Sequence, residues 1–190
     1  AMVKAGKIGG FGFSEIAPTS LYRAAAIHEI AAVQSEYSLS VRSPEMGLVQ
    51  ATAALGVSLV AFSPLGRSLL TDKPHSRATA VASGWLTSNP RFVEPNLTAN
   101  IEAGARFRAL AAEMGMSAAA LAIAWLLHKA PHILPIPGTR SVDHLREHCD
   151  GAAKTLSPDD MDRIEAALPI GWAHGDRYAD AQWVGPERYC

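Results

Sequence analysis

Polar and aromatic side chains gather where four short apolar runs of the sequence end. The segments concerned are Ser14–Glu15, Gln34 with Tyr37, Phe62–Gly66 and Pro137–Arg140. In parallel sheets, ligands bind at the carboxyl ends of the strands. A hydroxyl, an amide, an aromatic face and a cation at the start of a helix suit a nucleotide, and a Gly-Thr-Arg turn offers N–H groups and charge to a phosphate. Ordinary strand-to-helix turns use the same residue types, so this second interpretation stays open.

The elements that must position these residues follow from the apolar pattern. Short apolar runs predict strands at 8–14, 30–37, 57–63 and 132–137. Helical spacing, with Ser-Pro starts for two of the helices, predicts helices at 18–28, 43–55, 100–114, 117–129, 141–149 and 157–168. We expect residues 66–98 to form a long loop and residues 170–190 an irregular tail. Strands that alternate with helices predict an α/β fold with a parallel sheet, in one domain spanning 1–190.

Composition narrows the classes of partner. The net charge is −1 and 48% of the residues are hydrophobic, so a sizeable core is expected and a nucleic-acid partner is not. No apolar run approaches the roughly 18 residues of a transmembrane helix, so no membrane partner is expected either. The two cysteines, Cys149 and Cys190, do not make a disulfide framework, and the opening residues lack a signal-peptide pattern. These features favour a cytoplasmic location.

Four stretches of the sequence resemble, in order and spacing, the aldo-keto reductase family. They are GKIGGFGFSE (6–15), AAVQSEYSL (31–39), LVAFSPLGR (59–67) and ILPIPGTRSVDHLRE (133–147). The terminal GPERY (185–189) is also similar to the end of some members. The resemblance implies a (β/α)₈ barrel that reduces carbonyls with NADPH, without metal or flavin. The four stretches correspond to strands five to eight, so the expected fold is a parallel (β/α) half-barrel, the C-terminal half of a TIM barrel.

The resemblance also assigns twelve residues to NADP(H) binding, along the length of the cofactor. At the nicotinamide end, the carboxamide would be held by Ser14 and Gln34, and the ring would stack on Phe62. The pyrophosphate loop would be lined by Ser63, Leu65 and Arg67.

The adenosine end is assigned in the same way. The 2′-phosphate would be bound by Gly138, Thr139 and Arg140, and the adenine side by His144, Glu147 and His148. His148 departs from the family pattern, in which an Asn is usual.

No catalytic residue is assigned. The family's catalytic Asp, Tyr, Lys and His lie in the first half of the barrel, and neither Tyr22 nor Tyr37 matches the position of the catalytic Tyr. Reduction of a carbonyl needs a proton donor as hydride arrives. We therefore expect a truncated reductase that is inactive alone, whose small-molecule carbonyl substrate belongs to the full-length family. Half a barrel exposes strand edges and an apolar inner face, so we also expect self-association.

Other readings remain open. The residues 144–148 spell H-x-x-E-H, in which two histidines on one helix face can bind Zn²⁺ with a glutamate as general base of a hydrolase, although the sequence places no third ligand. The chain is alternatively a non-enzymatic relic that binds nucleotide only, or nothing. The long loop and the tail carry large aromatic side chains that would cover a substrate pocket or only shield apolar surface: Trp85, Phe92, Trp172 and Trp183.

Overall fold

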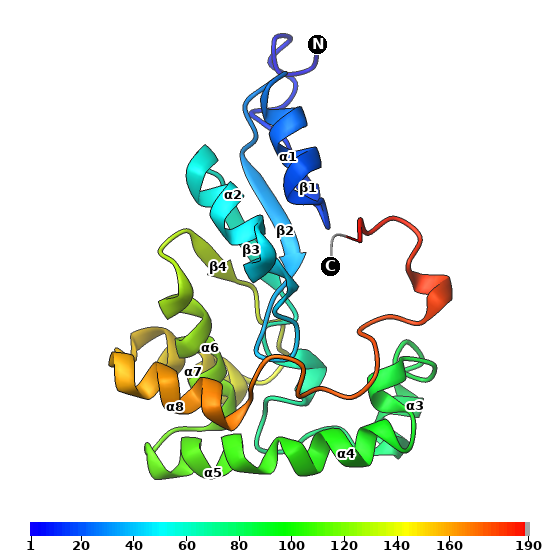
Figure 1. Ribbon diagram of the computed structural model, residues 1–190, viewed down its shortest axis with the longest axis vertical. Coiled ribbons are helices and arrows are strands. Elements are labelled where there is room, and N and C mark those ends of the chain that lie inside the picture. The colour runs from blue at the N-terminus through cyan, green and yellow to red at the C-terminus, as the bar shows by residue number, and fades with distance from the viewer. Residues whose placement is uncertain (189–190) are drawn as a thin grey trace.

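The computed structural model, which describes residues 1–188, is built around a four-stranded parallel sheet (Figure 1). The strands lie side by side in chain order: β1 (Gly12–Ser14), β2 (Ala32–Glu36), β3 (Ser58–Phe62) and β4 (Ile133–Pro135). All three pairings are parallel, which confirms the expected α/β class. Of the residues discussed above, Cys190 and the last tyrosine of GPERY lie outside the described part.

The two faces of the sheet differ in burial. Val33, Leu59 and Ile133 point to one face and are almost completely buried. Helix α2 (Leu48–Leu55) packs on β3 at this face, and α6 (Ala118–Lys129) packs on β4. The opposite face is open, because Gln34 is exposed and half of the Leu134 surface is accessible. Alternation along the strands thus separates a helix-covered face from a bare one.

Several helix signals in the sequence are confirmed. Nine consecutive residues of α6, Ala118–Leu126, are buried on all sides, as the apolar run predicts. Helix α8 (Pro158–Ala167) begins with a reciprocal capping box between Ser157 and Asp160. The remaining helices are α1 (Pro18–Ala25), α3 (Arg77–Ala82), α4 (Asn96–Ala103), α5 (Ala105–Glu113) and α7 (Val142–Ala153).

Two predicted elements are corrected. The helix expected at 43–55 is split: Gly47 has φ 124°, so a 3₁₀ turn (Ser43–Met46) precedes α2. The segment 66–98 is not one long loop, because it contains α3, two short 3₁₀ turns and the start of α4. Helix α3 begins where the Ser76 side chain accepts a hydrogen bond from the Thr79 N–H.

The tail after α8 is fastened to the body by buried polar groups. The Trp172 indole donates to the Leu39 carbonyl at 2.8 Å. The Asn100 side-chain oxygen accepts from the His174 N–H at 2.7 Å, and the Asn89 amide donates to the Arg177 carbonyl at 2.7 Å. Figure 1 shows the tail running back toward the carboxyl ends of β1 and β2. The tail therefore belongs to the packed structure although its sequence has no period.

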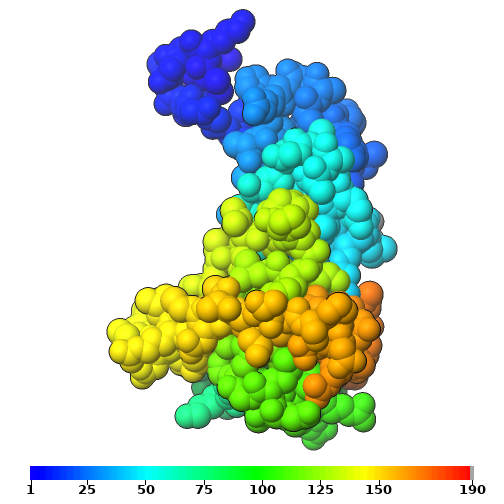
Figure 2. Space-filling view, turned by 90° about the vertical axis from the view of Figure 1, so that its left-hand side faces the viewer, coloured from blue at the N-terminus to red at the C-terminus, as the bar shows by residue number. Residues whose placement is uncertain are grey.

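Shape and helix length complete the description. Figure 2 shows an elongated molecule in which the first residues project from one end. Among residues 1–188, no single helix is long and apolar enough to cross a membrane. Two successive helical segments, Asn96–Glu113 and Ala118–Lys129, are together long and apolar enough to cross a membrane. The chain bends by 88° between them.

Candidate functional site

A cavity of about 820 Å³ lies where β3 and β4 end and α7 begins. That volume is in the range of small-molecule sites. Nine of the twelve residues assigned from the sequence line this cavity: Phe62, Ser63, Leu65, Arg67, Gly138, Thr139, His144, Glu147 and His148. Segments that are about 70 residues apart in the sequence are thus brought together by the β3–β4 pairing.

The other three assigned residues lie outside the cavity lining. Ser14 and Gln34 are exposed and directly paired across β1 and β2. Gln34 pairs with Val60, two residues before Phe62, so all three residues assigned to the nicotinamide share the open face of the sheet. Arg140 is exposed and does not line the cavity.

The loop after β3 holds an unusual backbone. Ser63, Arg67 and Ser68 have φ values of 49°, 55° and 88°, in the left-handed region that residues other than glycine rarely adopt. Each such residue costs on the order of 1–3 kcal/mol. The surrounding structure supports the loop, since the Ser68 hydroxyl accepts a hydrogen bond from the His75 N–H at 2.9 Å. A strained loop held in place at the end of a strand is typical of a binding segment.

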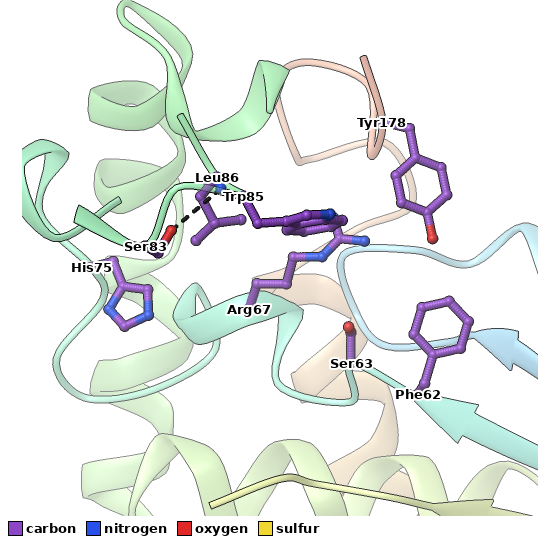
Figure 3. Close-up of a pocket in the computed structure, with 8 residues that line it drawn as sticks. All are labelled: Phe62, Ser63, Arg67, His75, Ser83, Trp85, Leu86 and Tyr178. Atoms are coloured by element: carbon purple, nitrogen blue, oxygen red, sulfur yellow. Dashed lines mark hydrogen bonds between the residues drawn. The ribbon is translucent and has the colours of Figure 1, made fainter. Parts of the chain in front are cut away.

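Arg67 is held by contacts on every side. Its guanidinium donates to the Glu36 carboxylate at 2.7 Å and to the Arg177 carbonyl at 2.8 Å. It lies 4.6 Å from the Trp85 ring centre and 5.2 Å from that of Tyr178. Figure 3 shows the guanidinium beneath the Trp85 ring, with Phe62 and Tyr178 on the other side. Arg67 therefore borders the cavity with its charge already compensated.

These aromatic residues line a second, open recess of about 430 Å³ next to the first. Four residues line both spaces: Phe62, Ser63, Arg67 and His75. The rest of the smaller recess is lined by Ser83, Trp85, Leu86 and Tyr178. Among the aromatic residues of the loop and tail, Trp85 thus covers a recess, whereas Phe92 and Trp172 are buried in the core.

Helix α7 forms the other wall of the large cavity. Ser141 caps its first turn by accepting from the His144 N–H, and the Thr139 hydroxyl accepts from the Ser141 N–H at 3.1 Å. His148 is 6% exposed, and its Nδ1 has no partner among the described residues. Burial lowers the pKa of His148 from 6.5. A Cβ on Gly151 would meet the Ala120 carbonyl oxygen at 2.4 Å, so α7 packs directly on α6, which fixes the position of His148.

A buried cluster of acids and arginines, which the sequence reasoning missed, ties the site to the tail. Glu15 accepts from the Ser35 hydroxyl at 3.0 Å and from the Glu36 N–H at 2.7 Å, and it forms an ion pair with Arg177. Arg177 also lies 3.4 Å from Glu36, which is the partner of Arg67. Glu15 and Glu36 stand at the ends of apolar runs, and this position was a signal that each needs a buried cation. The sequence around Arg177 contains no local signal that identifies it as that cation.

Burial sets the electrostatics of this cluster. It raises the pKa of Glu36, against the opposing effect of Arg67 and Arg177. Burial also disfavours the charged form of Arg177, but the hydrogen bond and charge of Glu15 outweigh this and raise the pKa of Arg177. The acids and arginines of this cluster have lost contact with water, and the attraction between their opposite charges offsets that loss.

The zinc alternative finds no geometric support. His144 is exposed, whereas His148 is buried. Within residues 1–188, no group of three or more His, Cys, Asp and Glu side chains is placed to hold a metal ion.

Comparison with known proteins decides the family. A sequence model of the aldo/keto reductase family matches residues 1–169. The chain belongs to the aldo/keto reductase family. A probable aldo-keto reductase of Glycine max is 37% identical over 177 residues, which are 93% of this chain and 51% of that protein. The aldo-keto reductase str7 of Strobilurus tenacellus is 31% identical over 181 residues, 94% of this chain and 54% of that protein.

Solved structures of the family share the fold. A glycerol dehydrogenase from Gluconobacter oxydans superposes with a TM-score of 0.74 at 22% identity, over 88% of this chain and 51% of that one. A thermostable aldo-keto reductase in complex with the inhibitor epalrestat gives a TM-score of 0.65 at 25% identity, over 87% and 51%. The chain therefore spans about half the length of the aldo-keto reductases it matches. Arg177 lies beyond the segment that the family model matches.

Proposed function

We propose that the chain forms the NADP(H)-binding side of an aldo-keto reductase that interconverts small carbonyl compounds and alcohols. The observation that carries the proposal is the meeting of nine assigned residues in one cavity that adjoins the open sheet face bearing Ser14 and Gln34. A reduced nicotinamide supplies the hydride in this chemistry.

The residues present fit this cofactor. Phe62 offers an aromatic face beside Gln34, whose exposed amide suits the carboxamide. At the other end, the capped first turn of α7 presents N–H groups to an anion, and the buried Nδ1 of His148 has no partner in the described structure. A buried polar atom without a partner favours a ligand that supplies one. His148 thus takes the adenine-side role in place of the usual Asn.

The site lacks a good proton donor for the carbonyl oxygen among the described residues. Tyr178 lines the smaller recess together with Phe62. Burial, Glu36 and Glu15 raise the pKa of Tyr178, which makes its hydroxyl a weaker acid. Arg177 and Arg67 oppose this shift without reversing it. We therefore propose that the chain alone binds the cofactor without catalysing turnover.

The sheet corresponds, in this proposal, to strands five to eight of the family's barrel. One hydrophobic core runs from Ile16 to Trp172, in keeping with a single half-barrel domain over 1–190. In the described structure the outer edges of β1 and β4 carry no further strand, and Leu134 and Ile136 are half exposed beside them. Such edges pair with other chains. Light scattering should give a mass well above 20.1 kDa, and a stable monomer at high concentration would contradict self-association.

A titration with NADPH, followed by quenching of tryptophan fluorescence, tests cofactor binding. We expect saturable binding in the micromolar range and weaker binding of NADH. Arg140→Ala should lose affinity, because the family resemblance assigns this exposed arginine, which lies just before α7 at the edge of the cavity, to the 2′-phosphate. Arg106→Ala, an exposed arginine of α5, is the matched control and should bind normally. No binding of NADPH at millimolar concentration would refute the proposal and leave a relic without cofactor.

A further inference from the structure

A third cavity, of about 300 Å³, lies between the tail and the segment that follows β2. It shares no lining residue with either space around Phe62. Its walls are rich in arginine and include one indole: Ser40, Val41, Arg42, Ser43, Arg91, Gly171, Asp176, Arg177, Trp183, Glu187 and Arg188. A concave space with convergent charges and an aromatic wall has the character of a small-molecule site.

Arg91 is a cation of this cavity without an ion pair among the described residues, whereas Arg42 and Arg177 each pair with two carboxylates. Its backbone is fixed on both sides, because its N–H donates to Asn89 at 3.1 Å and its carbonyl accepts from Asn100 at 3.1 Å. Its side chain makes one hydrogen bond within residues 1–188, from Nε to the Gly175 carbonyl at 3.2 Å. No carboxylate of the described residues lies within 4 Å of it. The two terminal nitrogens of its guanidinium are therefore without a partner among residues 1–188.

Burial lowers the pKa of Arg91 to about 10, with Glu36 and Asp176 favouring its charge and Arg67 and Arg177 opposing it. The side chain thus stays charged at neutral pH, in a place where burial penalises the charge. A bound anion would offset that penalty, since a partly buried cation gains most from a partner that replaces lost water.

The carboxylates of the same wall are already engaged. Asp176 accepts from the Trp183 indole at 3.0 Å, and Glu187 accepts from the Ala17 N–H at 2.7 Å. Both remain negative charges beside the cavity and offset part of the positive charge of its four arginines. One negative charge on the ligand is therefore enough to balance Arg91, which favours a carboxylate.

The indole of Trp183 indicates what the rest of the ligand, beyond its anionic group, is like. Arg177 lies 4.8 Å from its ring centre and Arg188 lies 4.2 Å from it, so the ring is held by cations. Together with Val41 it forms the apolar part of the wall. A flat apolar body fits such a surface.

We propose that this cavity binds a small organic monocarboxylate, with the carboxylate on the Arg91 guanidinium and the apolar body against Trp183. The site is separate from the proposed NADP(H) cavity, and its test needs no cofactor. The failure of one proposal is therefore distinguishable from the failure of the other.

Fluorine NMR of 4-fluorobenzoate, titrated with the whole chain without cofactor, tests the site. We expect saturable binding, while the uncharged 4-fluorobenzamide does not bind and inorganic phosphate fails to compete at equal concentration. Arg91→Gln should weaken binding about tenfold or more, as expected for the loss of a charge-assisted pair, and Arg106→Gln should leave it unchanged. Thermal melting verifies that the Arg91 variant is folded.

Three results would overturn the proposal: no saturable binding of 4-fluorobenzoate, equal binding of the amide, or equal competition by phosphate. All three are measured on the unmodified chain, so they hold even where Arg91→Gln does not fold. Unchanged affinity in a folded Arg91→Gln variant would also overturn it.

Discussion

Replacing Arg177 with glutamine tests how the tail is held to the site. Arg177 is the shared counterion of Glu15 and Glu36, and all three side chains are at most 10% exposed. Removing one partner of a buried ion pair costs about 3–5 kcal/mol, because the remaining charge is left buried and unpaired. For a chain of this size that loss corresponds to a fall in Tm of roughly 6–20 °C. Urea unfolding followed by circular dichroism measures the free energy of unfolding directly.

Two comparison variants separate this effect from a general loss of charge. Arg146→Gln removes the partner of Asp143, and these side chains are 72% and 82% exposed, so the cost should stay below about 1 kcal/mol. Glu36→Gln should also cost about 3–5 kcal/mol, because it leaves Arg67, whose side chain is 10% exposed, without its carboxylate partner. A loss below about 1 kcal/mol in either Arg177→Gln or Glu36→Gln would refute this reasoning.

Two further substitutions test the packing of α7. Burial lowers the pKa of His148 from 6.5. As the pH falls, the unfolded chain therefore binds a proton at this histidine before the folded chain does. The stability that neutral His148 confers is complete above pH 6.5 and is lost as the pH falls below that value. His148→Asn should therefore flatten the fall in urea midpoint between pH 7 and 5, whereas exposed His144→Asn should not, and equal slopes would contradict the burial of His148. Gly151→Ala should lower the free energy of unfolding by about 1–3 kcal/mol, because its Cβ meets the Ala120 carbonyl oxygen at 2.4 Å. Gly9→Ala, with open space around it, is the control, and equal losses would show that α7 does not pack as described.

Local signals in the sequence predicted where helices lie better than they predicted where helices are broken. The Ser-Pro-Asp-Asp start at 157–160 and the apolar run of α6 correspond directly to a capped start and a buried helix. The break at Gly47 was missed because Ser43 and Pro44 also suit a helix start. Helix α3 was missed because it is short and lies among prolines and glycines, which are typical of loops.

The same distinction applies to the candidate site. Residues that follow strands were placed together by the order of the sheet, so nine of twelve meet in one cavity. Arg140, two residues before α7, is exposed and does not line the cavity. The ion pairs of Glu15 and Glu36 with Arg177 join residues more than 140 positions apart, and no local pattern specifies such contacts.

Amide hydrogen exchange with and without NADPH tests most directly whether the cavity between the β3 loop and α7 holds the cofactor. At saturating NADPH we expect slower exchange in residues 62–68 and 138–148, which line the cavity, and unchanged exchange in 96–113, which lie outside it. Unchanged exchange in both lining segments, or protection confined to other parts of the chain, would contradict the proposed site.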